Sequence, residues 1–285
     1  MRNHTSEYND NFRFSVLIPV YIKENPLYLR SALQSILDDQ TIVPDEVVIV
    51  EDGPITTDLE KVLTDFQGRY TSIVKRYQLK ENGGMGLAMN YGLNQASFEW
   101  VARMDSDDIS VANRFEKQIN FLKENPGIDV LGSSIEEFNS TPGDLVRYRT
   151  LPEENDNIIG LMKFRNPVNH MTVFFRKALA LKVGGYWPHK YNEDYNLWYE
   201  LFKVGARFHN LKENLVHVRV GNNMVARRSG YTYFEYEKIL LKKFLRDGFI
   251  TPLEYSFLIG IKFSLRIIPV KLLKMVYKLF LRKSN

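Results

Sequence analysis

The sequence predicts an α/β fold in which helices cover a mostly parallel, Rossmann-like β-sheet. Through the first half of the chain, short runs of apolar and β-branched residues alternate with segments that carry apolar residues at helical spacing. Continuous apolar runs of this kind are typical of strands buried on both faces of a parallel sheet. Hydrophobic residues make up 44% of the 285 positions, which is enough for a substantial core and excludes a disordered chain.

The first half of the chain supplies the alternating elements. In order, they are expected at residues Phe14–Tyr21 (strand), Pro26–Leu37 (helix), Glu46–Val50 (strand), Thr57–Phe66 (helix), Ser72–Tyr77 (strand), Met85–Ala96 (helix) and Glu99–Met104 (strand). Ligands bind beyond the carboxyl ends of the strands in such sheets. Asp52 and the run Asp105–Asp108 each follow a predicted strand. We therefore expect both to lie at this edge.

The second half is less regular. Strands are expected over Ile128–Ile135, Met171–Phe175 and Leu215–Val220, and a helix over Asn192–Val204. No repeat or low-complexity linker divides the chain, so we expect one main domain over residues 12–228, after a polar tail of residues 1–11. Residues 229–285 are helical, basic and aromatic in pattern and form a C-terminal extension.

Charge is distributed unevenly along the chain. Residues 231–285 hold 11 Lys/Arg against 4 Asp/Glu, whereas residues 1–230 hold 27 against 30. Basicity confined to one end indicates a local anionic partner, either nucleic acid or lipid headgroups. The chain has no cysteine, which excludes a disulfide scaffold, a thiolate zinc site and a cysteine nucleophile. No signal-peptide core precedes Phe12, and a cytoplasmic location fits, although the absence of cysteine would also suit a periplasmic protein.

The run Asp105-Ser106-Asp107-Asp108 is the most informative feature. Three carboxylates within four residues repel one another unless a cation intervenes. In extended backbone Asp105 and Asp107 point the same way, which suits Mg²⁺ or Mn²⁺ shared with phosphates. The alternative is an acidic turn that caps a helix beginning near Val111, with Asp108 or Ser110 as the N-cap.

Three further features each have a functional and a structural interpretation. Asp52 closes a strand at a Gly-Pro turn, where aspartate is common for turn reasons alone. The glycine-rich loop Asn82–Asn90 would let backbone N–H groups approach a phosphate, but it lacks the lysine of a P-loop and the spacing of a dinucleotide fingerprint. Glu193 and Asp194 begin a helix. The functional interpretation is a general base, and the structural one is that acidic residues in a first turn complement the helix dipole.

Together these pieces resemble the family 2 glycosyltransferases, which are inverting enzymes with the GT-A fold. The resemblance covers about residues 14–228 and has the family's order and spacing. Its motifs are Pro19-Val-Tyr21 with Glu24, Asp52 after the second strand, Asn82-x-Gly84-x₃-Ala88-x-Asn90-x-Gly92, Arg103-Met-Asp-Ser-Asp-Asp108 and Glu193-Asp-Tyr-x-Leu-Trp198.

The resemblance implies a role for each matched residue. Asp107 would be the direct metal ligand, with Asp105 near the ribose and the metal, and Asp194 would be the catalytic base with Glu193 beside it. His170 precedes a strand and is either a hydrogen-bonded structural residue or a contact of the sugar. The residues expected to bind the nucleotide-sugar are Pro19, Tyr21, Glu24, Asp52, Asn82, Gly84, Asn90, Arg103, Asp105, His170, Arg227 and Arg228.

The pattern from Val218 to Arg228 looks like that of bacterial β-1,3-galactosyltransferases that build surface polysaccharides and O-antigen. It implies a UDP-galactose donor, with UDP-glucose or a UDP-N-acetylhexosamine as alternatives, and a polyprenyl-diphosphate-linked saccharide acceptor. One position departs from the family, because Gly221 stands where many members have histidine. A sugar-phosphate nucleotidyltransferase fits less well, since Pro19–Glu24 is not a glycine-rich basic loop.

The C-terminal extension is expected to lie on an anionic membrane surface. Lys271, Lys274, Lys278 and Arg282 form one helical stripe within the segment Lys271–Lys283. The preceding apolar run is too short and too interrupted to span a bilayer. A basic amphipathic helix lies among the headgroups instead, which would place the protein on the inner face of the cell membrane. The alternative is a helix docked on the main domain. Nucleic-acid binding would not explain carboxylates at strand ends.

Overall fold

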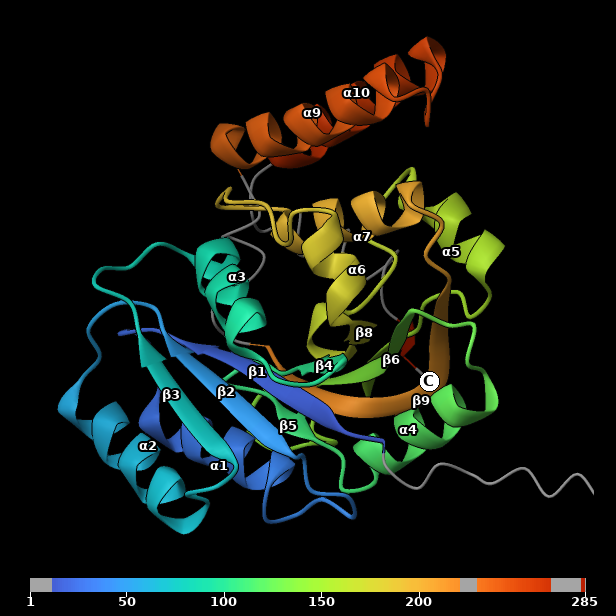
Figure 1. Ribbon diagram of the computed structural model, residues 1–285. Helices are drawn as coiled ribbons and strands as arrows, with labels where there is room; N and C mark the ends of the chain where they lie inside the picture. Colours follow the sequence, from blue (N-terminus) through green and yellow to red (C-terminus); the bar gives the residue numbers. More distant parts are fainter. Residues whose placement is uncertain (1–11, 221–229, 268–282, 285) are drawn as a thin grey trace, which may run out of the picture.

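The computed structural model describes residues 12–220, 230–267 and 283–284. Figure 1 shows a curved sheet with helices on both of its faces. In chain order the elements are β1 (Phe14–Val20), α1 (Pro26–Ile36), β2 (Glu46–Glu51), α2 (Thr57–Arg69), β3 (Val74–Gln78), α3 (Met85–Gln95), β4 (Trp100–Arg103), β5 (Ile109–Ser110), α4 (Arg114–Glu124), β6 (Val130–Phe138), β7 (Arg147–Arg149), α5 (Asn155–Met162), the 3₁₀ helix η1 (His170–Thr172), β8 (Phe174–Arg176), α6 (Lys177–Lys182), α7 (Glu193–Lys203), β9 (Phe208–Arg219), α9 (Tyr231–Arg246), α10 (Pro252–Ile267) and β10 (Lys283–Ser284).

The sheet confirms the predicted fold class. Strands β3, β2, β1 and β4 lie side by side and are parallel, as the alternating pattern predicts. Beyond β4 the sheet continues through β8, β6 and β7 in antiparallel pairs, while β9 runs parallel to β6 and then pairs with β5. The carboxyl ends of β1, β2 and β4 therefore meet at one edge, where the predicted site residues follow.

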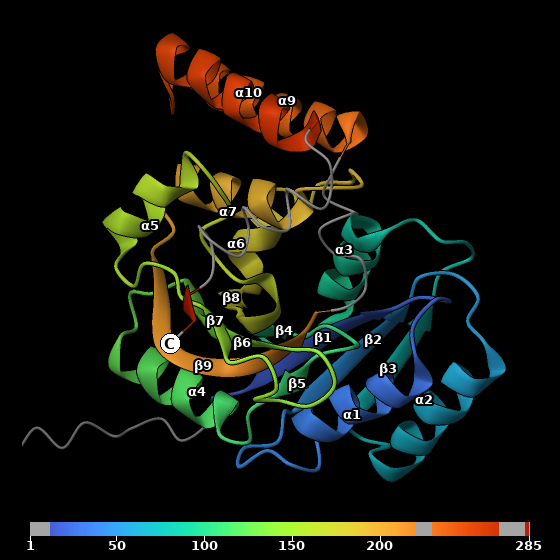
Figure 2. The same ribbon diagram turned by 180° about the vertical axis from the view of Figure 1, so that it is seen from behind.

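Two apolar cores hold the layers together. Val16 and Ile18 of β1 face the core under α1, α2 and α4, whereas Leu17 between them faces the core under α3, α6 and α7. All three side chains are fully buried. Burial on both faces is the reason for the continuous apolar run in this strand, because successive strand residues point to opposite faces. Figures 1 and 2 show the two helical layers from opposite sides.

Helices α9 and α10 form a hairpin that lies against α7 (Figure 1). The buried ring of Phe244 on α9 lies 5.8 Å from the ring of Tyr195 and 4.3 Å from that of Tyr199, both on α7. Lys203 of α7 binds Asp247 at 2.8 Å, just beyond α9. The described part of the predicted extension thus shares a core with the main domain.

A buried ion-pair group joins the two helices of the hairpin. Glu237 of α9 accepts hydrogen bonds from Lys262 and Arg266 of α10, each at 2.8 Å. The Arg266 guanidinium also stacks on the ring of Tyr233, 4.6 Å from its centroid. A buried carboxylate with two cationic donors fixes the pairing of these helices, because separating them would leave its charge unpaired.

Several predictions fall outside the described residues. These are the polar tail of residues 1–11, Gly221, the pair Arg227 and Arg228, and the basic helix up to Arg282. Lys283, which was expected to end that helix, lies instead in β10, which pairs with β7. None of the described helices is long and apolar enough to cross a bilayer.

Candidate active site

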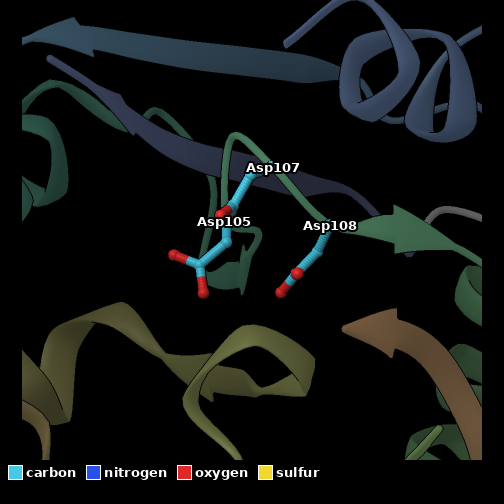
Figure 3. A group of neighbouring side chains, drawn as sticks. All are labelled: Asp105, Asp107 and Asp108. Atoms are coloured by element: carbon cyan, nitrogen blue, oxygen red, sulfur yellow. The ribbon is translucent and has the colours of Figure 1, made fainter. Parts of the chain in front are cut away.

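The acidic run forms the turn between β4 and β5. Carboxylate oxygens of Asp105, Asp107 and Asp108 lie within 4.8 Å of one another. Figure 3 shows the three side chains leaving this turn toward the same side. The strand before the turn is buried and parallel to β1, so the turn projects from the ligand-binding edge of the sheet.

Arg103 anchors the first of these carboxylates. It is only 2% exposed and forms an ion pair with Asp105. Two of its guanidinium nitrogens, Nε and Nη1, are buried without a hydrogen-bond partner. A side chain so enclosed acts here through Asp105, which it holds in place.

Asp108 joins the turn to β9. Its Oδ1 accepts a hydrogen bond from the backbone N–H of Arg219 at 2.8 Å, and its Oδ2 is buried without a partner. Helix α4 begins only at Arg114, with Asn113 at its N-cap. The prediction that Asp108 or Ser110 caps this helix is therefore wrong. Arg219 also donates to the Asp107 carbonyl at 3.2 Å.

The electrostatics of the turn favour a bound cation. Burial, together with the charges of Asp105 and Glu24, raises the pKa of Asp107 to about 7. Burial, together with the charges of Asp105 and Asp107, raises the pKa of Asp108 well above its usual range. Ser106 ties Glu24 to the turn with a 2.6 Å hydrogen bond. Crowded carboxylates with an unsatisfied buried oxygen fit a hard divalent cation such as Mg²⁺ or Mn²⁺.

Asp52 and the glycine-rich loop are bonded to each other. The Asp52 carboxylate accepts from the backbone N–H groups of Gly83 at 2.7 Å and Gly84 at 3.0 Å, and Asn82 donates to its carbonyl. Two of the loop's backbone donors, those of Gly83 and Gly84, are thus engaged by Asp52. Pro19 is buried in β1, and Tyr21, just beyond it, is 38% exposed.

The two predicted base candidates begin α7. Asn192, at the N-cap, has a positive φ of 61° that turns the chain into the helix. The Asp194 Oδ2 atom accepts a 2.6 Å hydrogen bond from Asn166 Nδ2, which fixes the carboxylate. The start of α3 approaches closely: a Cβ on Gly86 would lie 2.2 Å from the Trp187 carbonyl oxygen and 3.5 Å from Glu193 Cβ.

Tyr186 connects the acidic turn with the start of α7. Its buried hydroxyl lies 3.0 Å from His170 Nε2. Burial raises the pKa of this hydroxyl, the charge of Arg103 lowers it, and the charges of Asp194, Glu193 and Asp105 raise it further. The charges of both predicted acidic groups therefore act on one tyrosine hydroxyl.

His170 and Asn90 support this tyrosine. Burial and the charge of Arg103 lower the pKa of His170 well below its usual range, so the ring is neutral at physiological pH. The Asn90 amide binds the backbone of Tyr186 twice, at 2.6 and 2.7 Å. These contacts favour the structural interpretation of His170 and give Asn90 a positioning role.

Sequence reasoning assigned no individual role to Tyr186, Asn166 or Arg219. Tyr186 follows two glycines that both have positive φ, at 90° and 72°. That glycine pair is a turn signal from which Tyr186 could have been found. Arg219 lies in the stretch used for the resemblance, but nothing local indicates that its backbone N–H meets Asp108. Asn166 carries no local signal for its contact with Asp194.

The family model for "Glycosyl transferase family 2" matches residues 15–181. The chain belongs to glycosyltransferase family 2. A nucleotidyltransferase is thereby disfavoured. This glycosyltransferase is 42% identical to an uncharacterized glycosyltransferase of Haemophilus influenzae, over 95% of this chain and 100% of that protein. It is 37% identical to the UDP-Gal:alpha-D-GlcNAc-diphosphoundecaprenol beta-1,3-galactosyltransferase of Escherichia coli, over 96% of this chain and 98% of that protein.

Solved structures confirm the GT-A fold of this glycosyltransferase. TarS of S. aureus superposes with a TM-score of 0.63 at 22% identity, over 94% of this chain but only 44% of TarS. Mannosyltransferase PcManGT of Pyrobaculum calidifontis, in complex with GDP-Man and Mn²⁺, superposes with a TM-score of 0.60 at 14% identity, over 87% of this chain and 68% of that one.

Proposed function

We propose that this glycosyltransferase transfers galactose from UDP-galactose, with inversion, onto a lipid-diphosphate-linked saccharide and forms a β-1,3 linkage. The observation that carries the proposal is the cluster of Asp105, Asp107 and Asp108, whose carboxylate oxygens lie within 4.8 Å of one another at the ligand-binding edge of the sheet. The E. coli relative, 37% identical, bears this activity in its name. Such a reaction belongs to the synthesis of bacterial surface polysaccharide. UDP-glucose and UDP-N-acetylhexosamines are the alternative donors.

The reaction is a single displacement. The Asp194 carboxylate takes the proton from an acceptor hydroxyl, whose oxygen attacks the anomeric carbon of the donor sugar. The bond between that carbon and the diphosphate oxygen breaks, and the nucleoside diphosphate leaves with the bonding electrons. Attack from the face opposite the leaving group converts an α-linked donor into a β-linked product. Asn166 keeps Asp194 oriented during the transfer.

The acidic turn would hold the metal. Asp107 and Asp105 are the proposed ligands, and Asp108 lies within reach as a third carboxylate. Bound Mn²⁺ or Mg²⁺ supplies positive charge that stabilises the departing diphosphate. The PcManGT complex, which contains Mn²⁺, supports this choice. Arg103 would contribute by holding Asp105 in place through their ion pair.

A donor panel tests the function directly. The full chain is incubated with Mn²⁺ and each of UDP-galactose, UDP-glucose, the UDP-N-acetylhexosamines and GDP-mannose, and release of the nucleoside diphosphate is measured. We expect the fastest release from UDP-galactose and a β-linked product by NMR when a lipid-diphosphate N-acetylglucosamine is added. A clear preference for GDP-mannose, or an α-linked product, would overturn the proposal.

We also propose that the enzyme works at the inner face of the cell membrane. Leu253, Phe257 and Ile261 lie four residues apart along α10 and are 83%, 63% and 40% exposed. They form an apolar stripe on one side of the hairpin. The chain beyond Ile267 contains five basic residues and no acidic one. An apolar face next to basic chain suits shallow binding to anionic lipid, beside a lipid-linked acceptor.

A further inference from the structure

Helix α4 places a buried arginine against the strand end that leads into the acidic turn. Arg114 is the first residue of α4, and its side chain is fully buried. Its Nη2 atom donates a hydrogen bond to the carbonyl oxygen of Arg103, the last residue of β4, at 2.8 Å. The backbone N–H of Arg103 donates to the Val173 carbonyl oxygen at 2.9 Å. The end of β4 is therefore fixed from two sides, two residues before Asp105.

The guanidinium of Arg114 binds only neutral groups in the described part of the chain. Besides the Arg103 carbonyl, these are Gln118 Oε1, which accepts from Nε at 3.0 Å, and Met104 Sδ, which accepts from Nη1 at 3.3 Å. A buried cation without an anionic partner is costly, and apolar residues of similar volume often serve stability better. Stability alone therefore does not account for an arginine here, whereas a need to hold several acceptors in place does, because its donors form a rigid fork.

Gln118 extends this contact to the 3₁₀ helix η1. Its Nε2 atom donates to the Thr172 carbonyl oxygen at 2.8 Å, and Thr172 Oγ1 accepts from the backbone N–H of Ser133 in β6 at 2.9 Å. All three of these residues are fully buried. Helix η1 also carries His170, whose Nε2 atom lies 3.0 Å from the Tyr186 hydroxyl. Helix α4 thus fixes both the strand end before the acidic turn and the helix that supports this tyrosine.

We propose that Arg114 is a positioning residue, which holds the acidic turn in the conformation that binds the metal. This inference rests on the proposed function. The three carboxylates of the turn lie within 4.8 Å of one another and repel each other before a cation binds, which favours their separation. The turn resists separation only if the strand end from which it departs is fixed. Arg114 fixes it through the Arg103 carbonyl.

Titration of the metal-free full chain with Mn²⁺, without any sugar, tests this role by calorimetry. Arg114→Met removes every donor and should raise the Kd for Mn²⁺ by about tenfold or more, as loss of groups that orient metal ligands commonly does. Arg114→Lys should raise it less, because the ammonium still donates to the Arg103 carbonyl.

Leu122→Ala is the matched control. Leu122 is buried on the same helix, so this variant loses stability without losing a hydrogen bond to β4, and it should bind Mn²⁺ like the wild type. Thermal unfolding ranks the variants by stability. If Leu122→Ala weakens Mn²⁺ binding as much as an Arg114 variant of equal or higher Tm, the effect is general destabilisation and the positioning role is wrong.

Hydrogen exchange of the metal-free protein gives a second readout. Backbone amides of residues 104–108 should exchange about tenfold faster or more in Arg114→Lys and Arg114→Met, and unchanged in Leu122→Ala. If the wild type binds Mn²⁺ but neither the Kd nor this exchange depends on Arg114, the inference fails and the proposed function stands. If the wild type binds no Mn²⁺ while exchange at the turn depends on Arg114, the proposed metal site fails, whereas the role of Arg114 in holding the turn stands.

Discussion

At the acidic turn, burial makes it unfavourable for the neighbouring carboxyl groups to be charged at the same time. Asp108 is 2% exposed and Asp107 lies beside it, and burial dominates the upward shift of the pKa of both. Arg103 and the backbone N–H of Arg219 compensate only part of this negative charge. The turn therefore gains from any further positive charge, and protons compete with a metal ion for it.

The first prediction concerns pH and metal. Asp107 has a folded pKa of about 7, above its unfolded value of about 3.9. Between these values the folded metal-free protein holds a proton that the unfolded chain has lost, so its free energy of unfolding falls as pH rises. Bound Mn²⁺ displaces this proton. We expect Mn²⁺ to raise Tm more at pH 8 than at pH 6, since apparent affinity falls about tenfold per pH unit below the pKa.

Differential scanning fluorimetry with and without Mn²⁺ measures this effect. Asp107→Asn removes both the proton and the ligand, and should abolish the Mn²⁺ shift and the transfer activity while the protein stays folded. A Tm shift that is equal at both pH values, or that survives in Asp107→Asn, would contradict the assignment.

The second prediction concerns the base. Asp194→Asn should reduce kcat by about 10²- to 10⁴-fold with donor binding retained, because the amide keeps the shape but accepts no proton. Asn166→Ala removes the 2.6 Å hydrogen bond and should lower kcat less, since the carboxylate remains. Glu193→Gln is the control and should lower kcat only slightly. A large loss of kcat in Glu193→Gln together with a small loss in Asp194→Asn would identify Glu193 as the base instead.

At the scale of elements, α9 supports the helix that carries the proposed base. The rings of Tyr191 and Tyr236 lie 5.4 Å apart, which joins the segment just before α7 to α9. Lys243 of α9 donates to Asn196 Oδ1 on α7 at 2.7 Å. Phe244 lies between two aromatic residues of α7 and Phe249. The hairpin therefore restrains α7 from the face opposite the sheet.

The third prediction follows from this packing. Phe244→Ala removes a fully buried ring and should cost about 3–5 kcal/mol of unfolding free energy. Faster hydrogen exchange in α9, α10 and α7, with a fall in kcat, is the expected result. Leu253→Ala, at a side chain that is 83% exposed, should change stability by less than about 0.5 kcal/mol. Unchanged exchange in α7 in the Phe244 variant would show that the hairpin does not restrain it.

At the scale of the whole molecule, the positive charge of the C-terminal extension is concentrated at its end. Residues 230–267 contain six basic and four acidic residues, whereas residues 268–285 contain five basic and none acidic. Within the hairpin, Lys262 and Arg266 are paired with Glu237, and Lys243 with Glu200. Attraction to an anionic surface therefore falls mainly to the chain after α10, and the apolar stripe would supply contact with lipid.

The fourth prediction separates these two contributions. The variant with Leu253, Phe257 and Ile261 all changed to serine should bind anionic vesicles more weakly at any salt concentration. Deleting residues 268–285 should remove the salt-dependent part of the binding free energy, which is on the order of 1 kcal/mol for each lysine or arginine. Sedimentation with anionic and neutral vesicles at low and high salt measures both. If the wild type ignores anionic vesicles at low salt, the hairpin is only a structural support.

The sequence alone predicted the strands and helices of the parallel half of the sheet and the acidic run at a strand end. Apolar runs predicted β1, β2 and β4, and helical spacing predicted α1, α2 and α3, because burial on both faces and amphipathicity leave local patterns. The acidic turn was predicted at a strand end for the same local reason. Strands overlapping β6, β8 and β9 were also expected, but their pairing was not, since they pair across long stretches of chain without a distinctive pattern.

Only the tertiary structure decided what each polar side chain contacts. Asp52 meets Gly83 from 31 residues away, Asn90 meets Tyr186 from 96, and Asn166 meets Asp194 from 28. Hydrogen bonds at such separations depend on how strands and helices pack, and the residue types themselves are equally suited to solvent, to a ligand or to the backbone. The motifs therefore located the acidic turn and the start of α7, whereas packing alone brought Asn90 and His170 to Tyr186.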